Sequence, residues 1–226
     1  MSRIAFDDSA QARSGMNERR FISLWERCIG SPGKAVFDQV DARYREPHRC
    51  YHGPAHVEHC LRELDEAGTR VPNRDAVEMA LWFHDVIYDV PEAPAPDNEQ
   101  RSAEFFGLCA GRGGTGRFRA DVRRLILITE HRVLPEAEDE RFMIDIDLSS
   151  FGVGWSEFLR NSRAVRLEQP QVPDDRFHAG IQGFMRGMLA RPRFCFTAFF
   201  RARHEQAAID NINRYLAMPQ PVGQGK

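Results

Sequence analysis

The stretch ALWFHDVIYDV, residues 80 to 90, places a histidine and an aspartate, His84 and Asp85, in the middle of an otherwise apolar run. An ionised carboxylate that leaves water without partners costs several kcal/mol or more. Such a pair must be satisfied by hydrogen bonds, by an opposite charge or by a metal ion. The remaining polar residues of the chain indicate which of these applies.

Three histidines, His52, His56 and His59, crowd into the upstream segment RCYHGPAHVEHCLREL. If this segment is helical, His56 shares an inward face with Cys60 and Leu64, whereas His59 lies about a third of a turn away. Of the three, only His56 therefore stands where a ligand of an interior site is expected.

Acidic residues and another histidine recur in apolar surroundings further along the chain. His131 ends the segment LILITEHR, and Asp145 and Asp147 lie within MIDIDLSSFG. Taken singly, an interior histidine is ordinarily a hydrogen-bonded core residue and an interior aspartate often caps a helix. Their joint occurrence with the residues above calls for a common explanation.

Four of these residues, His56, His84, Asp85 and Asp147, combine two imidazoles with two carboxylates, and one cation would explain all four burials together. Without a cation the two carboxylates would repel each other, and we expect the pKa of at least one of them to be raised. Mixed nitrogen and oxygen ligands suit Mn²⁺, Fe²⁺, Co²⁺, Ni²⁺ or Zn²⁺ better than Ca²⁺. We expect manganese or another of these transition metals, with Mg²⁺ as an alternative activator.

The elements that must position these residues are predicted to be helices. Apolar residues recur at spacings of three and four, whereas sustained alternation and hairpin turns such as Asn-Gly or Asp-Gly do not occur. The predicted helices span 17–29, 34–46, 54–67, 74–88, 98–110, 118–131, 138–149, 154–167, 175–190 and 198–216. Pro54 suits a first helical turn, Gly68 suits a helix end, and the PEAPAP segment, 91–96, predicts a stiff loop.

Composition predicts one soluble, cytoplasmic domain. The chain has 226 residues, of which 42% are apolar and 28% charged, enough for one sizeable core. A net charge of −2 gives no general attraction to nucleic acid polymers or membranes, and no signal peptide or membrane-spanning run is seen. Five scattered cysteines suggest free thiols. We expect a domain over 17–217, with flexible ends at 1–16 and 218–226.

A set of motifs resembles the HD superfamily of metal-dependent phosphohydrolases, in particular a bacterial branch of predicted enzymes. The motifs are R-x-Y-H-x-x-x-H (49–56), W-F-H-D-x-x-Y-D (82–89), D-N-E-x-x-S-A (97–103), T-x-H (129–131) and D-x-D-L (145–148). The similarity extends through R-x-E (166–168) and LARPR (189–193) and covers about residues 17 to 217. The resemblance implies an all-α, HD-domain-like helical bundle.

The resemblance also implies that His56, His84, Asp85 and Asp147 hold the metal. Asp147 is preferred to Asp145 because the last ligand of the superfamily precedes a short apolar helical continuation, which matches Asp147-Leu148. The chain departs from the family pattern at two positions: Ile181 stands where relatives tend to have arginine, and Cys195 where they tend to have tyrosine. Substrate contacts from this C-terminal region are therefore open, as is the binding of a second metal ion.

Further candidates surround this predicted centre. A divalent cation would lower the pKa of a bound water and polarise a phosphoryl oxygen. Two residues could transfer the proton: Asp89, which lies on the same face as Asp85 if that helix continues, and Glu99. The alternative role of Glu99 is to complement a helix dipole.

The expected substrate-binding residues are Arg49, His52, Arg101 and His131. The alternative role of the histidines is to orient ligands, and the arginines could be ordinary exposed residues. The aromatic residues Trp82, Phe83, Phe105 and Phe106 are expected in the core.

The sequence therefore predicts a phosphomonoesterase or phosphodiesterase that acts on a small phosphorylated metabolite, with a nucleotide as the first candidate. Two other classes stay open: a di-iron oxygenase of the HD type, in which extra histidines complete a second site, and a catalytically silent nucleotide-binding protein. The oligomeric state is also open, a homodimer included.

Overall fold

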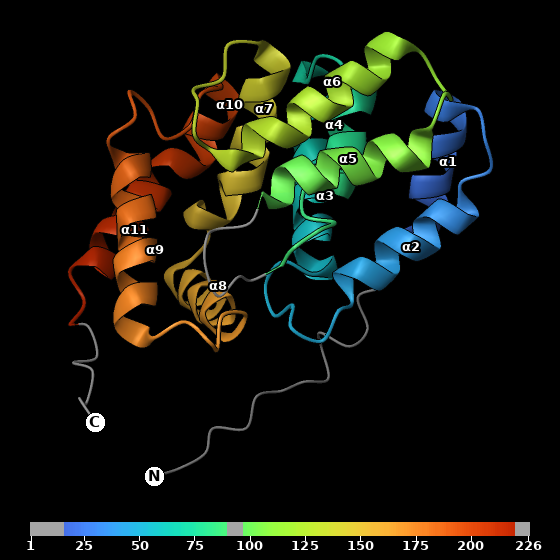
Figure 1. Ribbon diagram of the computed structural model, residues 1–226. Coiled ribbons are helices and arrows are strands. Elements are labelled where there is room, and N and C mark those ends of the chain that lie inside the picture. Colours follow the sequence, from blue (N-terminus) through green and yellow to red (C-terminus); the bar gives the residue numbers. More distant parts are fainter. Residues whose placement is uncertain (1–15, 90–96, 220–226) are drawn as a thin grey trace.

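Helices form the described part of the protein, residues 16–89 and 97–219 of the computed structural model, and no strand occurs there (Figure 1). The predicted all-α fold is confirmed, with one compact domain. The predicted flexible ends and the PEAPAP loop fall largely outside the described residues. The helices are α1 (Glu18–Ile29), α2 (Lys34–Tyr44), α3 (Pro54–Ala67), α4 (Arg74–Phe83), α5 (Asn98–Ala110), α6 (Gly116–Leu127), α7 (Glu138–Asp147), α8 (Trp155–Leu167), α9 (Asp174–Leu189), α10 (Ala198–Phe200) and α11 (Gln206–Leu216). A 3₁₀ turn, η4 (Leu148–Gly152), extends α7, and a π turn, η5 (Arg201–Glu205), joins α10 to α11.

Local start and stop signals account for most helix ends. The side chain of Asn17 accepts a hydrogen bond from the backbone N–H of Arg20, which caps α1. Pro54 is the first residue of α3, and Gly68 follows its last residue with a positive φ, as their residue types predict.

One helix is shorter than predicted: α4 ends at Phe83 rather than near residue 88. The guanidinium of Arg49 explains the early end, because it donates to the backbone carbonyls of Asp85 at 2.5 Å and Val86 at 3.0 Å. These bonds satisfy carbonyl groups that a continuing helix would have used itself. The chain can therefore leave the helical path directly after the His-Asp dipeptide.

The core is centred on α4, which packs against α1, α3, α5, α6 and α7. Aromatic rings from α1 and α4 meet there, with Phe21 and Trp82 edge to face at 5.3 Å between ring centroids. Trp82, Phe83 and Phe106 are fully buried and Phe105 packs against the same cluster, so the predicted core role of these residues is confirmed. The rigid centre of the molecule thus carries His84 and Asp85 at its end.

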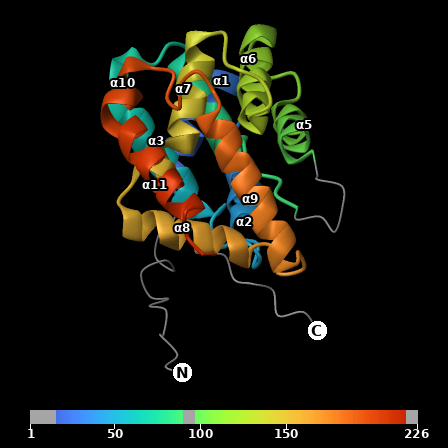
Figure 2. The same ribbon diagram turned by 90° about the vertical axis from the view of Figure 1, so that its left-hand side faces the viewer.

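The C-terminal helices form a second group around η4. Figure 2 shows α8 running across one end of the molecule, with α9 and α11 along one side. Both α8 and α11 pack against η4, and α9 contacts α11. None of the described helices has the length and apolar character needed to cross a membrane. The site described below lies between this group and the α3–α4 core.

Candidate metal centre

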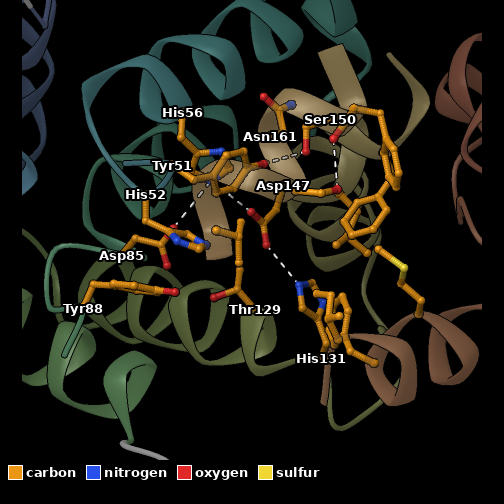
Figure 3. Close-up of a pocket in the computed structure, with 18 of the residues that line it drawn as sticks. Tyr51, His52, His56, Asp85, Tyr88, Thr129, His131, Asp147, Ser150 and Asn161 are labelled. Atoms are coloured by element: carbon orange, nitrogen blue, oxygen red, sulfur yellow. Dashed lines mark hydrogen bonds and ion pairs between the residues drawn. The ribbon is translucent and has the colours of Figure 1, made fainter. Parts of the chain in front are cut away.

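Four predicted ligands, His56, His84, Asp85 and Asp147, meet at one point and are called here the His-Asp cluster. His56 comes from the first turn of α3, His84 and Asp85 follow α4, and Asp147 ends α7. The Nε2 atoms of the two histidines lie 3.1 Å apart, and each lies 3.1 to 3.5 Å from an oxygen of both carboxylates. Figure 3 shows three of these side chains at the wall of one pocket.

The spacing and the donor set of the His-Asp cluster fit a metal ion with nitrogen and oxygen ligands. Nitrogen and oxygen ligands about 2.0 to 2.2 Å from one ion stand about 3.0 to 3.6 Å from each other in tetrahedral or octahedral geometry. The Nδ1–H of His84 donates to the carbonyl of Leu81 at 3.0 Å, which leaves the Nε2 lone pair facing the cluster. A cation at this point would satisfy both imidazoles and both carboxylates.

Protonation in the cluster differs from the sequence-based expectation. Burial alone would raise the pKa of Asp85 and Asp147, but the charges and hydrogen bonds of the surrounding histidines outweigh it and hold both pKa values below their usual range. Burial likewise opposes protonation of His84, yet the two carboxylates raise its pKa well above the usual value. The expected rise of a carboxylate pKa was wrong because the histidines lie within contact distance. The two ionised carboxylates of the cluster must be balanced by positive charge, which either protons on the histidines or a metal cation can supply.

Cys60 lies beside the cluster and enlarges the set of ligand atoms. His56, Cys60, His84 and Asp147 offer such atoms within 4.8 Å of one another, and this group could hold a metal ion. The thiol is the weakest of these donors, because burial and the nearby carboxylates raise its pKa and keep it protonated. Asp85, with an oxygen 3.1 Å from His84 Nε2, offers a carboxylate at the same place.

Asp145 and Asp147 have clearly different surroundings. Asp145 is buried and accepts hydrogen bonds from the backbone N–H groups of Phe196 and Thr197 at 2.8 and 2.7 Å, and from the Thr197 hydroxyl at 2.7 Å. It therefore anchors the segment that leads into α10. Asp147 instead faces the His-Asp cluster, where the sequence-based choice had placed it.

His131 supports the cluster from the opposite side of Asp147. Its Nε2 lies 3.1 Å from Asp147 Oδ2, a contact drawn in Figure 3. The backbone of His131 is left-handed, with a φ of 59°, at the end of the 3₁₀ turn that follows α6. Its Nδ1 is buried and has no hydrogen-bond partner among the described residues. The ring can therefore orient Asp147 while presenting a second nitrogen to another group.

His52 is held by a carboxylate that the sequence analysis did not single out, Glu168 at the end of α8. One oxygen of Glu168 accepts from the backbone N–H groups of Tyr51 and His52 at 2.7 and 2.8 Å, and the other contacts His52 Nδ1 at 2.7 Å. Tyr88 stacks on the ring at 4.1 Å between centroids. Burial lowers the pKa of His52, but Glu168 and other carboxylates raise it overall. The R-x-E motif was the available signal for Glu168.

Three predicted site residues lie elsewhere. Arg49 is a buried clamp on backbone carbonyls rather than a phosphate ligand in reach of the pocket. Asp89 and Arg101 pair with each other at 2.5 Å, and both are exposed and outside the pocket lining. The expectation for Asp89 was wrong in its premise, because α4 ends before Asp85 and cannot carry Asp89 onto the same face.

Glu99 does line the pocket, from the first turn of α5. Burial raises the pKa of its carboxyl, and the charge of Asp85 adds to the effect. Both effects favour the protonated form of this carboxyl, which is the form that a general acid needs. The structure thus separates the two proton-transfer candidates and leaves Glu99 at the site.

Acid pH should destabilise the protein through His59, which is largely buried. Its Nε2 lies 2.8 Å from Ser149 Oγ and donates to it, because this hydroxyl itself donates to the carbonyl of Ile146. Burial, together with the charge of His56, lowers the pKa of His59 to about 4. The unfolded chain takes up this proton near pH ~6.5, so the folded state should lose on the order of 3 kcal/mol as the pH falls from ~6.5 to ~4.

Chemical denaturation across this pH range measures the loss. In His59→Gln the amide can keep the hydrogen bond to Ser149 but cannot titrate, so the stability profile should flatten. The exposed His48 provides the control, and His48→Gln should leave the profile unchanged. A His59→Gln profile as steep as that of the parent protein would place the acid sensitivity in another group.

Comparison with known proteins adds no relative. No family model, curated protein or solved structure matches the chain.

Proposed function

We propose that the protein is a metal-dependent phosphohydrolase that acts on a small phosphorylated metabolite. The convergence of His56, His84, Asp85 and Asp147 at the wall of a pocket carries the proposal. These four residues would hold one divalent ion, with Mn²⁺ or another transition metal preferred by the mixed donor set. The resemblance to the HD superfamily supports the same reading.

When bound, a divalent cation lowers the pKa of a coordinated water and offers positive charge to a phosphoryl oxygen. The residues of the chain would supply the remaining functions. Asp147 is held in place by His131. His52, fixed through Nδ1 by Glu168, has Nε2 left to donate to a phosphoryl oxygen. Histidines, rather than arginine guanidinium groups, would thus donate hydrogen bonds to the phosphoryl group of the substrate.

Glu99 would deliver the proton that the leaving oxygen requires. Its carboxyl lines the same pocket, and its raised pKa favours the protonated form needed in a general acid. No serine or cysteine nucleophile is invoked, since the Cys60 thiol is buried and protonated. Hydrolysis would therefore depend on added metal.

Phosphate release from a panel of nucleotides, sugar phosphates and aryl phosphates, with Mn²⁺, Co²⁺, Ni²⁺ or Mg²⁺, tests the proposal. We expect turnover with at least one metal and its loss in excess EDTA, followed by recovery when metal is restored. Turnover that persists in excess chelator would contradict metal-dependent hydrolysis.

A di-iron oxygenase is the second candidate. The observation in its favour is the contact between His131 and Asp147, because these two residues would hold a second ion. Iron content and oxygen consumption separate the two classes: an oxygenase would need iron and O₂, whereas the phosphohydrolase should work equally well without oxygen.

A further inference from the structure

The pocket beside the His-Asp cluster has two chemically different ends. Its volume is about 240 Å³, below the range of about 300 to 1,000 Å³ typical of drug-sized ligands. The cluster and its flanking histidines form one end, and helices α8 and α9 with η4 form the other (Figure 3). A ligand whose phosphoryl group lies at the cluster must place the rest of its structure against the second end.

The second end is an apolar wall built by helical spacing. Phe158 and Val165 line it from one face of α8, and Ile181 and Phe184 line it from one face of α9. Phe151 from η4 closes the wall, with its ring centroid 6.2 Å from that of Phe184. These side chains provide dispersion contacts and bury apolar surface, but they provide neither a hydrogen bond nor an opposite charge to a charged group.

Histidines are the only basic side chains in the described lining of this pocket. Lysine and arginine are missing from it, whereas Asp85, Glu99 and Asp147 place three carboxyl groups there. Arg191, which approaches His131, donates to its backbone carbonyl at 2.7 Å and is not part of the lining. One divalent ion would offset the charges of Asp85 and Asp147, and His52 is assigned to the phosphoryl group. A second anionic group on a ligand would therefore find no partner.

Polar recognition at the apolar wall is limited to uncharged groups. Ser162 already donates to the carbonyl of Phe158 at 2.9 Å within its own helix. The Ser150 hydroxyl of η4 is paired with the Tyr51 hydroxyl at 2.6 Å. Asn161 lines the pocket with a side-chain amide. The wall can therefore form hydrogen bonds with one neutral polar substituent of a ligand, through the amide of Asn161.

We propose that the pocket selects a small organic monophosphate whose non-phosphoryl part is uncharged and largely apolar, such as an aryl or compact alkyl ester. This inference rests on the proposed function and narrows it. Nucleoside di- and triphosphates and sugar bisphosphates, which carry further charge away from the reacting phosphorus, are disfavoured by the same wall.

Binding of non-hydrolysable phosphonates to the Mn²⁺-loaded protein, measured by calorimetry, tests the ligand class without turnover. Benzylphosphonate should bind at least about tenfold more tightly than methylphosphonate, because its ring is buried against the wall. 4-Carboxybenzylphosphonate has the same ring with one added charge and should bind at least about tenfold more weakly than benzylphosphonate.

Three variants locate the selection. Ile181→Arg places a cation in the wall and should reverse the preference between the two benzyl ligands, whereas Gln182→Arg adds the same charge next to it, outside the lining, and should not. Phe184→Ala should bring benzylphosphonate toward the affinity of methylphosphonate, which covers the case in which Ile181→Arg does not fold. Equal affinities for all three phosphonates, or tighter binding of the carboxylated ligand to the parent protein, would overturn the inference.

The same measurements separate this inference from the proposed function. If no ester is hydrolysed but benzylphosphonate binds with the stated preference, the ligand class stands and hydrolysis fails. If phosphate is released most efficiently from nucleoside triphosphates, hydrolysis stands and the proposed ligand class fails. Absence of phosphonate binding to the Mn²⁺-loaded protein would count against both.

Discussion

Replacing Asp147 with asparagine should lower metal-dependent phosphate release by about 10³-fold or more and remove most of the stabilisation that Mn²⁺ confers. A metal that binds only the native state stabilises it by about 3 to 4 kcal/mol at a hundred to a thousand times its Kd. Asp147 supplies the carboxylate oxygen nearest to His56 Nε2 in the cluster, at 3.3 Å. An amide retains the volume of this side chain but loses the charge that a cation requires.

In the absence of metal, the free energy of unfolding of Asp147→Asn should lie within about 1 kcal/mol of that of the parent protein. In the absence of metal, Asp147 balances protons on the histidines, and the pKa of His84 is raised partly by this carboxylate. When the charge of Asp147 is removed, a histidine can release its proton, so no buried charge is left unpaired. Thermal unfolding of both proteins, with and without Mn²⁺, measures both effects.

Asp145→Asn is the matched control two residues away. It weakens three hydrogen bonds that hold the segment before α10, so it should destabilise the protein with and without metal by similar amounts. The Mn²⁺-induced shift should survive in this variant. If Asp145→Asn removed the metal shift and Asp147→Asn kept it, the assignment of the two residues would have to be exchanged.

The difference between these two aspartates shows what the sequence could predict. Helical spacing and capping residues predict most of the helices, because those signals are local. Asp145 and Asp147 are equivalent in local pattern, and the choice between them depended on family resemblance. Only tertiary packing reveals that Asp145 meets the backbone of Thr197, about fifty residues away. That the His-Asp cluster binds metal stays a prediction.

Long-range contacts also explain the residues that were misplaced. Arg49 has the chemistry of a phosphate ligand, but its role is decided by carbonyl groups some 36 residues away, at Asp85 and Val86. The same contacts end α4 early and carry Asp89 away from the site. Glu168 was missed for a related reason, since its partner His52 lies 116 residues earlier in the chain. No local pattern encodes such pairings.

Glu99→Gln should lower kcat by about 10² to 10⁴-fold with an alkyl phosphate, because the leaving alkoxide needs a proton. The carboxyl of Glu99 lines the pocket and has a raised pKa, so it can hold this proton, whereas an amide of the same shape cannot donate it as an acid. Asp89→Asn is the matched control: it alters only an exposed ion pair with Arg101 and should leave kcat within about twofold.

The leaving group distinguishes a general acid from a residue that only maintains the fold. With 4-nitrophenyl phosphate the leaving oxygen departs without protonation, so the loss in Glu99→Gln should shrink toward about tenfold or less. A structural defect would instead lower kcat for both esters alike and would appear as reduced thermal stability. Steady-state kinetics with the two esters, on protein whose melting temperature and Mn²⁺ content match the parent, makes this comparison. An equal loss for both esters in such protein would remove Glu99 as the proton donor, and His52, fixed by Glu168 at the same pocket, would become the next residue to test.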